Sequence, residues 1–142
     1  MDNHFLEQPL YEFFSSLWLA ETSSSPYWLA DNPSMGQSVP TSLIIQDYMG
    51  GDIMRGVVQL ESGRTDSHYW NMIGPDRLDV TGYQYGPFIS NISLKEPLLI
   101  PVREYLLENP DVQRRYDLLQ HQIKGQNIER FFRFLKPSPI AL

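Results

Sequence analysis

Cysteine is absent from this chain of 142 residues. A protein without thiols forms no disulfide and offers no thiolate ligands to a structural metal. Long hydrophobic runs are missing as well, because no stretch approaches the about 20 apolar residues that a membrane-spanning helix needs. The first ten residues, MDNHFLEQPL, are acidic and amphipathic rather than basic and then apolar. We therefore expect no signal peptide, no membrane partner and a cytoplasmic location.

Basic residues are scarce. The chain has 11 Lys and Arg against 17 Asp and Glu, which gives a net charge of -6. A phosphate backbone needs a basic face, so we expect no nucleic-acid partner. The three histidines lie far apart and have no metal-ligand spacing, so we expect no metal and no other cofactor.

Hydrophobic residues make up 42% of the chain and aromatic residues 13%, which is enough for the core of one domain. We expect a single domain over 1–142, in which 126–142 is a C-terminal extension with a short helix. Apolar spacing predicts a first helix over 9–20. Pro40 in a first turn and Gly50-Gly51 at the end predict a second helix over 39–49.

A meander is predicted after the second helix. Residues 53–60, 67–73 and 77–80 are typical of strands, with a tight turn at 74–76. A short helix should begin near Thr81, and 87–101, which contains three prolines, should be irregular. Asn109-Pro110 then opens a helix that ends near residue 124. The pattern is α+β, with an antiparallel sheet of about three or more strands packed against helices.

Three residues in this arrangement suggest chemistry. The tight turn between two strands can bring His68 and Asp79 side by side, and Ser38 lies at the start of a helix whose N-terminus can face the imidazole. Helix N-termini carry partial positive charge and unpaired N–H groups that can hold an oxyanion. The order is then nucleophile, base and orienting carboxylate.

Each of these residues also has a simpler structural interpretation. A serine at a helix start is usually an N-cap, worth about 1 kcal/mol. A histidine such as His68 in an aromatic strand is usually a packed or hydrogen-bonded core residue. An aspartate such as Asp79, just before a threonine, is usually part of a turn.

Several short motifs resemble the YunG-like family of small bacterial proteins. SHYWN, then LDVT and then Gln84-Tyr85 are similar to its strand motifs, and NPSMGQS with TSLIIQDYMGG is similar to its nucleophile segment. ETS near residue 22 and the closing RRYDLLQHQI extend the resemblance from about residue 9 to about residue 124. In that family the Gly-Gln pair is followed by Cys, and the strand motifs resemble transglutaminase-like and papain-like cysteine enzymes.

The resemblance implies a transglutaminase/papain-like core in which Ser38 occupies the Cys position, His68 is the base and Asp79 orients it. Three explanations for the serine stay open. It is an engineered Cys-to-Ser replacement, a natural serine variant that is active, or a mark of a pseudoenzyme that keeps the pocket. An alcohol gains little from a helix dipole and depends on His68 for activation, so we expect sharply lower activity than with Cys.

Two functions follow. The first is acyl transfer on an amide or thioester of a peptide, protein or small molecule, by hydrolysis, transamidation or deamidation. Its expected oxyanion or pocket residues are Gln37, Trp70, Asn71 and Trp28, with the backbone N–H groups of Ser38 and Gln37 on the oxyanion. The second is a catalytically silent binding or regulatory module, whose groove would be lined by exposed aromatic residues: Trp28, Tyr69, Trp70, Tyr83 and Tyr85. The substrate and the oligomeric state are not determined by the sequence.

Overall fold

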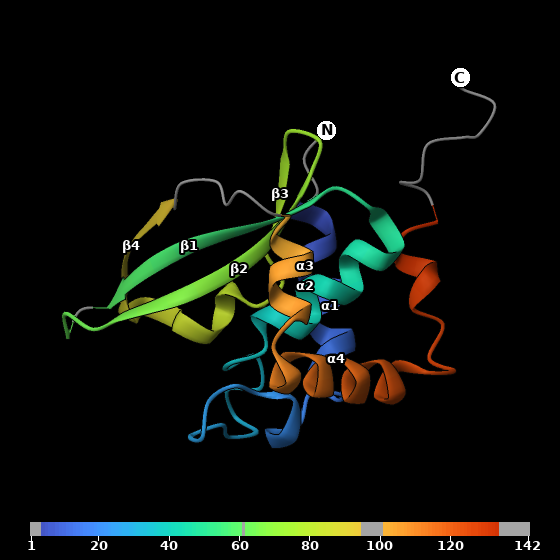
Figure 1. Cartoon of the computed structure of the whole chain (residues 1–142), viewed down its shortest axis with the longest axis horizontal. Helices are drawn as coiled ribbons and strands as arrows, with labels where there is room; N and C mark the ends of the chain where they lie inside the picture. The colour runs from blue at the N-terminus through green and yellow to red at the C-terminus, as the bar shows by residue number, and fades with distance from the viewer. Residues whose placement is uncertain (1–3, 61, 95–100, 134–142) are drawn as a thin grey trace.

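The computed structural model describes residues 4–60, 62–94 and 101–133. Figure 1 shows the elements in chain order. They are α1 (His4–Ser15), η1 (Ala20–Thr22), α2 (Ser38–Met49), β1 (Asp52–Leu60), β2 (Thr65–Ile73), β3 (Asp76–Leu78), η2 (Gly82–Phe88), β4 (Ile89–Leu94), α3 (Val102–Leu107), α4 (Pro110–Ile123) and η3 (Ile128–Phe131). No helix in the described ranges is both long and apolar enough to cross a membrane.

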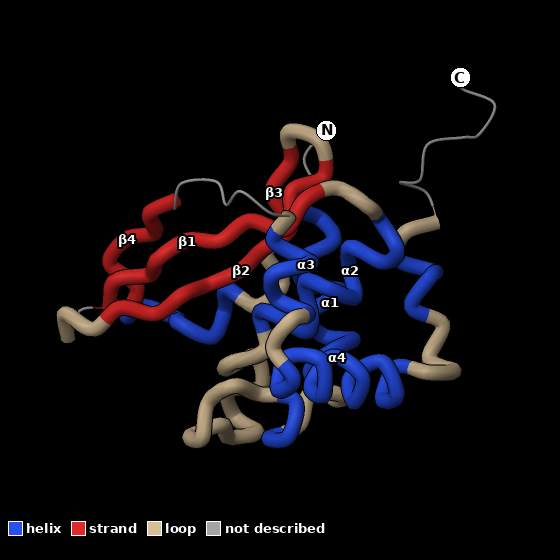
Figure 2. The backbone as a smooth tube through the Cα atoms, in the orientation of Figure 1, coloured by secondary structure: helices blue, strands red, loops and turns tan. Residues whose placement is uncertain are grey.

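The strands form one antiparallel sheet in the order β3-β2-β1-β4 (Figure 2). The predicted meander is present as β1, β2 and β3, and the predicted α+β class is confirmed. β4 was not expected, because three prolines between residues 87 and 101 predicted an irregular segment. None of them falls within Ile89–Leu94, and pairing with the distant β1 decides the conformation there.

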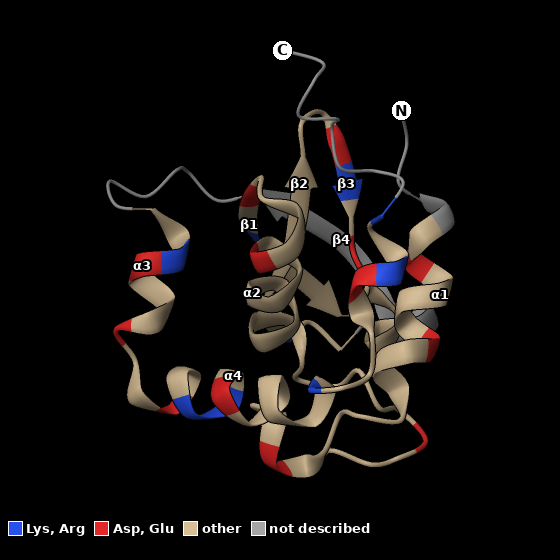
Figure 3. Cartoon of the chain, turned by 90° about the vertical axis from the view of Figure 1, so that its right-hand side faces the viewer, with Lys and Arg blue, Asp and Glu red and all other residues tan. Residues whose placement is uncertain are grey.

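The α-helices gather on one side of the sheet, and α2 is central among them (Figure 3). It packs against β2 and against α4. Asn71 of β2 donates a buried hydrogen bond of 3.0 Å from its amide to the carbonyl oxygen of Ser42 in α2. Trp18 donates from its indole to the Thr41 hydroxyl at 2.9 Å. These contacts fix the first half of α2, and with it Ser38, against the sheet.

The first helix begins earlier than its sequence predicted. The prediction placed Pro9 at the start, whereas α1 runs over His4–Ser15 with Pro9 inside it. An interior proline costs about 3 kcal/mol. Leu6, Leu10 and Phe14 are spaced four residues apart and buried, and each fully buried apolar side chain contributes about 1.5–3 kcal/mol. Burial of this stripe outweighs the lost hydrogen bond.

Helix ends marked by local signals lie where they were predicted. α2 closes at Gly50, which has a φ of 70°. Asn109 caps α4, since its side-chain oxygen accepts from the N–H of Asp111 at 2.8 Å. The short helix α3 was not predicted. The short helix predicted within 126–142 is represented by the 3₁₀ turn η3, and the residues after 133 lie outside the described part of the chain.

Leu43 of α2 is fully buried in the core, so its truncation tests how much α2 contributes to stability. We expect Leu43→Ala to lower the free energy of unfolding by about 2–5 kcal/mol, because it removes apolar contacts and leaves a cavity. Urea denaturation measures this. Leu29→Ala is the matched control, because Leu29 is 61% exposed, and its effect should stay within about 0.5 kcal/mol. Equal effects of the two substitutions would contradict the central position of α2.

Candidate functional site

The structure places His68 and Asp79 side by side. His68 lies in β2, and Asp79 directly follows β3, which pairs antiparallel with the end of β2. The imidazole Nε2 lies 3.0 and 2.8 Å from the two carboxylate oxygens of Asp79. The His68 side chain is fully buried and that of Asp79 is 9% exposed. A carboxylate only accepts hydrogen bonds, so Nε2 carries the ring proton and donates a hydrogen bond to Asp79.

Asp79 is held by two hydrogen bonds besides the one to His68, and Gly82 lies close to its carboxylate. Its backbone N–H donates to Glu7 of α1 at 2.7 Å. The Arg77 guanidinium donates to Oδ2 at 3.1 Å and also lies over the Trp70 ring, 4.3 Å from its centre. A Cβ atom at Gly82 would lie only 3.0 Å from Oδ2. The carboxylate that faces the imidazole is therefore fixed in position.

The other ring nitrogen of His68 has no partner. Nδ1 is buried and makes no hydrogen bond with the described residues. Tyr85 packs edge-on against the imidazole with ring centres 5.3 Å apart, and Trp70 lies 5.8 Å away. A buried polar atom without a partner is costly and calls for an explanation, and one explanation is a catalytic role.

Ser38 is not the N-cap of α2. That position belongs to Gln37, whose side chain makes no capping hydrogen bond, and Ser38 is the first helical residue. The first bond of the helix runs from the Thr41 N–H to the Gln37 carbonyl at 3.2 Å. The Ser38 hydroxyl makes no hydrogen bond with the described residues, and the residue is 8% exposed. The structural role usually given to such a serine therefore does not apply here.

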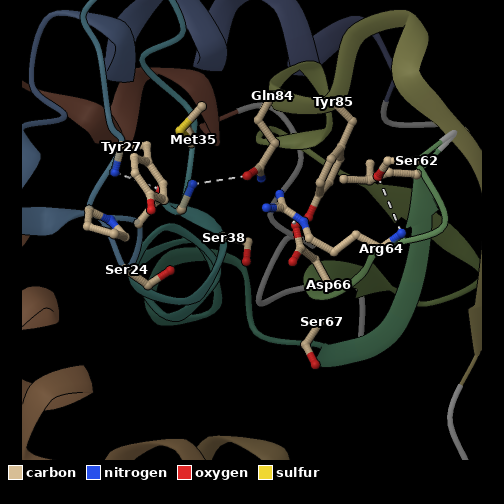
Figure 4. A pocket seen from close by; sticks show the side chains of 14 residues that line it. Ser24, Tyr27, Met35, Ser38, Ser62, Arg64, Asp66, Ser67, Gln84 and Tyr85 are labelled. Carbon is tan, nitrogen blue, oxygen red and sulfur yellow. Dashed lines mark hydrogen bonds and ion pairs between the residues drawn. The ribbon is translucent and has the colours of Figure 1, made fainter.

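Ser38 instead lines a cavity of about 700 Å³ (Figure 4). One wall comes from the loop of Ser24–Tyr27, and the opposite wall from the β1–β2 hairpin. Gln84 and Tyr85 line it as well, with Met35 and Gly36 from the segment that precedes Ser38. The Gln84 side-chain oxygen accepts from the Gly36 N–H at 3.0 Å and so links these two segments. The helix start thus opens onto a cavity that three separate segments enclose.

Ser38 and His68 do not form a hydrogen bond in this structure, and the imidazole is absent from the cavity lining. Side chains alternate along a strand. Asn71 faces α2, so His68 leaves β2 on the other face. Tyr85 contacts the imidazole and also lines the cavity together with Ser38, so its side chain adjoins both the His68–Asp79 pair and the cavity. The convergence of residues 38, 68 and 79 in one pocket stays a prediction.

Gln37 was expected to serve an oxyanion or the pocket, and its contacts point elsewhere. Its side-chain N–H donates to the carbonyl of Leu19 at 3.0 Å, and its backbone N–H donates to the carbonyl of Ser34 at 3.1 Å. Gln37 is fully buried and absent from the cavity lining. Both donors are therefore engaged in holding the loop that precedes α2.

The other three expected pocket residues also lie outside the cavity lining. Asn71 is buried against α2, and Trp70 is buried beneath Arg77. Trp28 donates from its indole to the carbonyl of Pro33 at 2.9 Å. Of the aromatic residues expected to be exposed in a groove, Tyr85 does line the cavity, but it is itself buried.

Several cavity residues were missed. Arg64 and Asp66 line it from the hairpin with side chains 68% and 41% exposed, and their charged groups lie 3.7 Å apart. Arg64 lies in the connection between β1 and β2 and Asp66 near the start of β2, and no sequence motif marks either residue as part of a site. Burial, with the charges of Asp66 and Asp79, raises the pKa of Tyr85, so its hydroxyl stays protonated. Within the described ranges, no group of three or more His, Asp or Glu side chains could hold a metal ion.

Comparison with known proteins gives one family. The family model described as YunG protein matches residues 6–127. No curated protein and no solved structure matches this chain. Since the family match runs from α1 past the end of α4, and so includes the His68–Asp79 pair and the start of α2, the chain belongs to the YunG family.

Proposed function

We propose that this protein carries an acyl-transfer site of transglutaminase/papain-like type. The site acts on an amide or thioester, and Ser38 stands in the position of a nucleophilic cysteine. The observation that carries the proposal is the buried imidazole of His68, with a carboxylate on Nε2 and no partner on Nδ1. Asp79 holds the tautomer whose Nδ1 accepts a proton, and it stabilises the imidazolium that forms.

The reaction uses residue 38 and His68 in turn. The nucleophile attacks the carbonyl carbon as its proton passes to Nδ1 of His68. The imidazolium returns that proton to the leaving amine or thiol, and an acyl-enzyme remains. Water, or an amine in transamidation, then attacks the acyl group with His68 again as the base, and the nucleophile leaves with its proton restored. Residue 38 and Nδ1 must come into contact for this transfer, and a rearrangement of Tyr85, which contacts the imidazole and lines the cavity, is part of this proposal.

The oxyanion of the intermediate would lie at the start of α2. The N–H groups of Ser38 and Val39 precede the first helical hydrogen bond and have no acceptor among the described residues. Pro40 has no N–H to contribute. The backbone N–H of Gln37 donates to the Ser34 carbonyl and is not free for an oxyanion. The proposed oxyanion site therefore consists of the N–H groups of Ser38 and Val39.

The serine sets a limit on the activity. A thiol, with an ordinary pKa of about 8.5, gains thiolate character from a helix N-terminus and an adjacent imidazolium. A hydroxyl is far less acidic and stays protonated at the same place. The proposed acyl transfer with Ser38 is accordingly slow, and a cysteine at this position would be the efficient nucleophile.

A second function, a binding module that keeps the cavity without chemistry, has one observation in its favour. Ser38 and His68 make no hydrogen bond with each other, although both lie within the described part of the chain. In this case the cavity binds its ligand and residue 38 is only part of the lining.

The proposed activation is tested by Ser38→Cys. Because the chain has no cysteine of its own, iodoacetamide modifies a single thiol in this variant. We expect alkylation at pH 6–7 to be at least tenfold faster than that of free cysteine, because the helix N-terminus and His68 favour the thiolate. Intact-mass spectrometry measures the rate. Ser24→Cys, at the exposed rim of the same cavity, is the matched control and should react like free cysteine. Equal rates in the two variants would rule out an activated site.

The role of the carboxylate is tested by Asp79→Asn in the Ser38→Cys background. An amide at position 79 neither stabilises the imidazolium nor enforces the tautomer, so we expect the alkylation rate at pH 6–7 to fall at least tenfold. The measurement is the rate of alkylation between pH 4 and pH 9. Asp52→Asn on the exposed end of β1 is the control and should leave the profile unchanged. If both profiles match the parent, Asp79 has only a structural role.

A further inference from the structure

Part of β2 is an edge of the sheet. β1 pairs with β2 along Thr65–Met72, but β3 is short and pairs only with Asn71–Ile73 on the other side. Residues 65–70 therefore have a strand neighbour on one side alone. Such an edge offers backbone donors and acceptors to another chain.

The register shows which groups face outward. The Leu60 N–H donates to the Arg64 carbonyl at 2.8 Å, so Leu60 and Arg64 occupy a hydrogen-bonded position of the ladder. Hydrogen-bonded pairs alternate in an antiparallel ladder. Asp66 and His68 consequently bond to β1, whereas the N–H and C=O groups of Thr65, Ser67 and Tyr69 point away from it. These outward groups have no partner in the described part of the chain.

The edge faces the cavity beside Ser38. Ser67 lines that cavity, together with Arg64 and Asp66 from the same hairpin (Figure 4). Thr65 and Ser67 are exposed to solvent, so no described element of the fold covers this end of the edge. On the opposite wall lies Tyr27, which is 75% exposed.

An extended peptide is the ligand whose chemistry fits. Its N–H and C=O groups repeat every two residues, as do those of Thr65 and Ser67, and its alternate side chains point toward and away from the cavity. The aromatic ring of Tyr27 offers one such side chain an apolar contact across the cavity. A small amide or thioester is too short to form hydrogen bonds with the outward N–H and C=O groups of both Thr65 and Ser67.

We propose that the edge of β2 at Thr65–Tyr69 binds an extended peptide segment as an added strand and brings one of its carbonyl groups to residue 38. The chemistry at residue 38 rests on the proposed function, whereas the binding does not require it. The substrate class is then a polypeptide rather than a small molecule. A second copy of this chain could use the same edge, but it would place its own hairpin, not a substrate segment, across Ser38.

The test is Ser67→Pro, with Ser67→Ala as the matched control. Proline removes the N–H that points outward and leaves the ladder to β1 intact, whereas alanine keeps the N–H and removes the hydroxyl. A phage-displayed library of random dodecapeptides is selected on the unmodified protein, and the enriched peptides are synthesised. We expect Ser67→Pro to bind them about tenfold more weakly, which corresponds to about 1.4 kcal/mol, and Ser67→Ala to bind them normally.

Hydrogen exchange in the unmodified protein gives a readout that does not depend on the variants. The bound peptide should slow exchange at the amides of Thr65 and Ser67 and leave those of Asp66 and His68, already bonded to β1, unchanged. Absence of any enriched peptide, equal binding by Ser67→Pro, or no slowing at Thr65 and Ser67 overturns the inference. A dimer seen by sedimentation that Ser67→Pro dissolves also overturns it, in favour of self-association.

Alkylation of the Ser38→Cys variant separates this inference from the proposed function. Rapid alkylation without peptide binding at the edge overturns the inference and leaves the activated site standing. Peptide binding at the edge with alkylation no faster than in free cysteine supports the inference and overturns the acyl-transfer proposal.

Discussion

The hydrogen bond between His68 and Asp79 is the interaction on which the rest of the site depends. It joins β2 to the residue after β3, and α1 reaches the same point through Glu7 and the backbone of Asp79. Three parts of the chain therefore meet at one buried polar pair. A buried ionised carboxylate is costly unless it is hydrogen-bonded, and here the imidazole and the Arg77 guanidinium meet that need.

Around this pair the fold separates two environments. The face of β2 that carries Asn71 packs against α2, and the face that carries His68 packs against Tyr85. The cavity lies at the unpaired end of β2, where the start of α2 and the hairpin approach each other. Ser38, the edge of β2 and the cavity belong to one region, and the imidazole of His68 lies outside it, in contact with Tyr85. The side chain of Tyr85 is therefore common to the cavity and to the buried His68–Asp79 pair.

Local signals predicted the elements that hold the site. Pro40 and Gly50 mark the ends of α2, Asn109 caps α4, and the tight turn near Gly74 brings Asp79 back toward His68. The sequence did not predict the elements whose conformation depends on distant parts of the chain. β4 exists because it pairs with β1, and α1 extends beyond Pro9 because its apolar stripe is buried. Neither partner can be seen within a short window of sequence.

The sequence by itself determined the α+β class, the position of Ser38 at a helix start and the contact between His68 and Asp79, because caps, turns and strand alternation act over a few residues. Only the tertiary structure decided which side chains reach the cavity. Gln37 and Asn71 are polar and adjacent to the proposed site, yet their donors bond to Leu19 and to α2. Arg64 and Asp66 line the cavity from the β1–β2 connection and the start of β2. A buried polar side chain takes whichever partner the packing places beside it, and that choice is made by segments far apart in the chain.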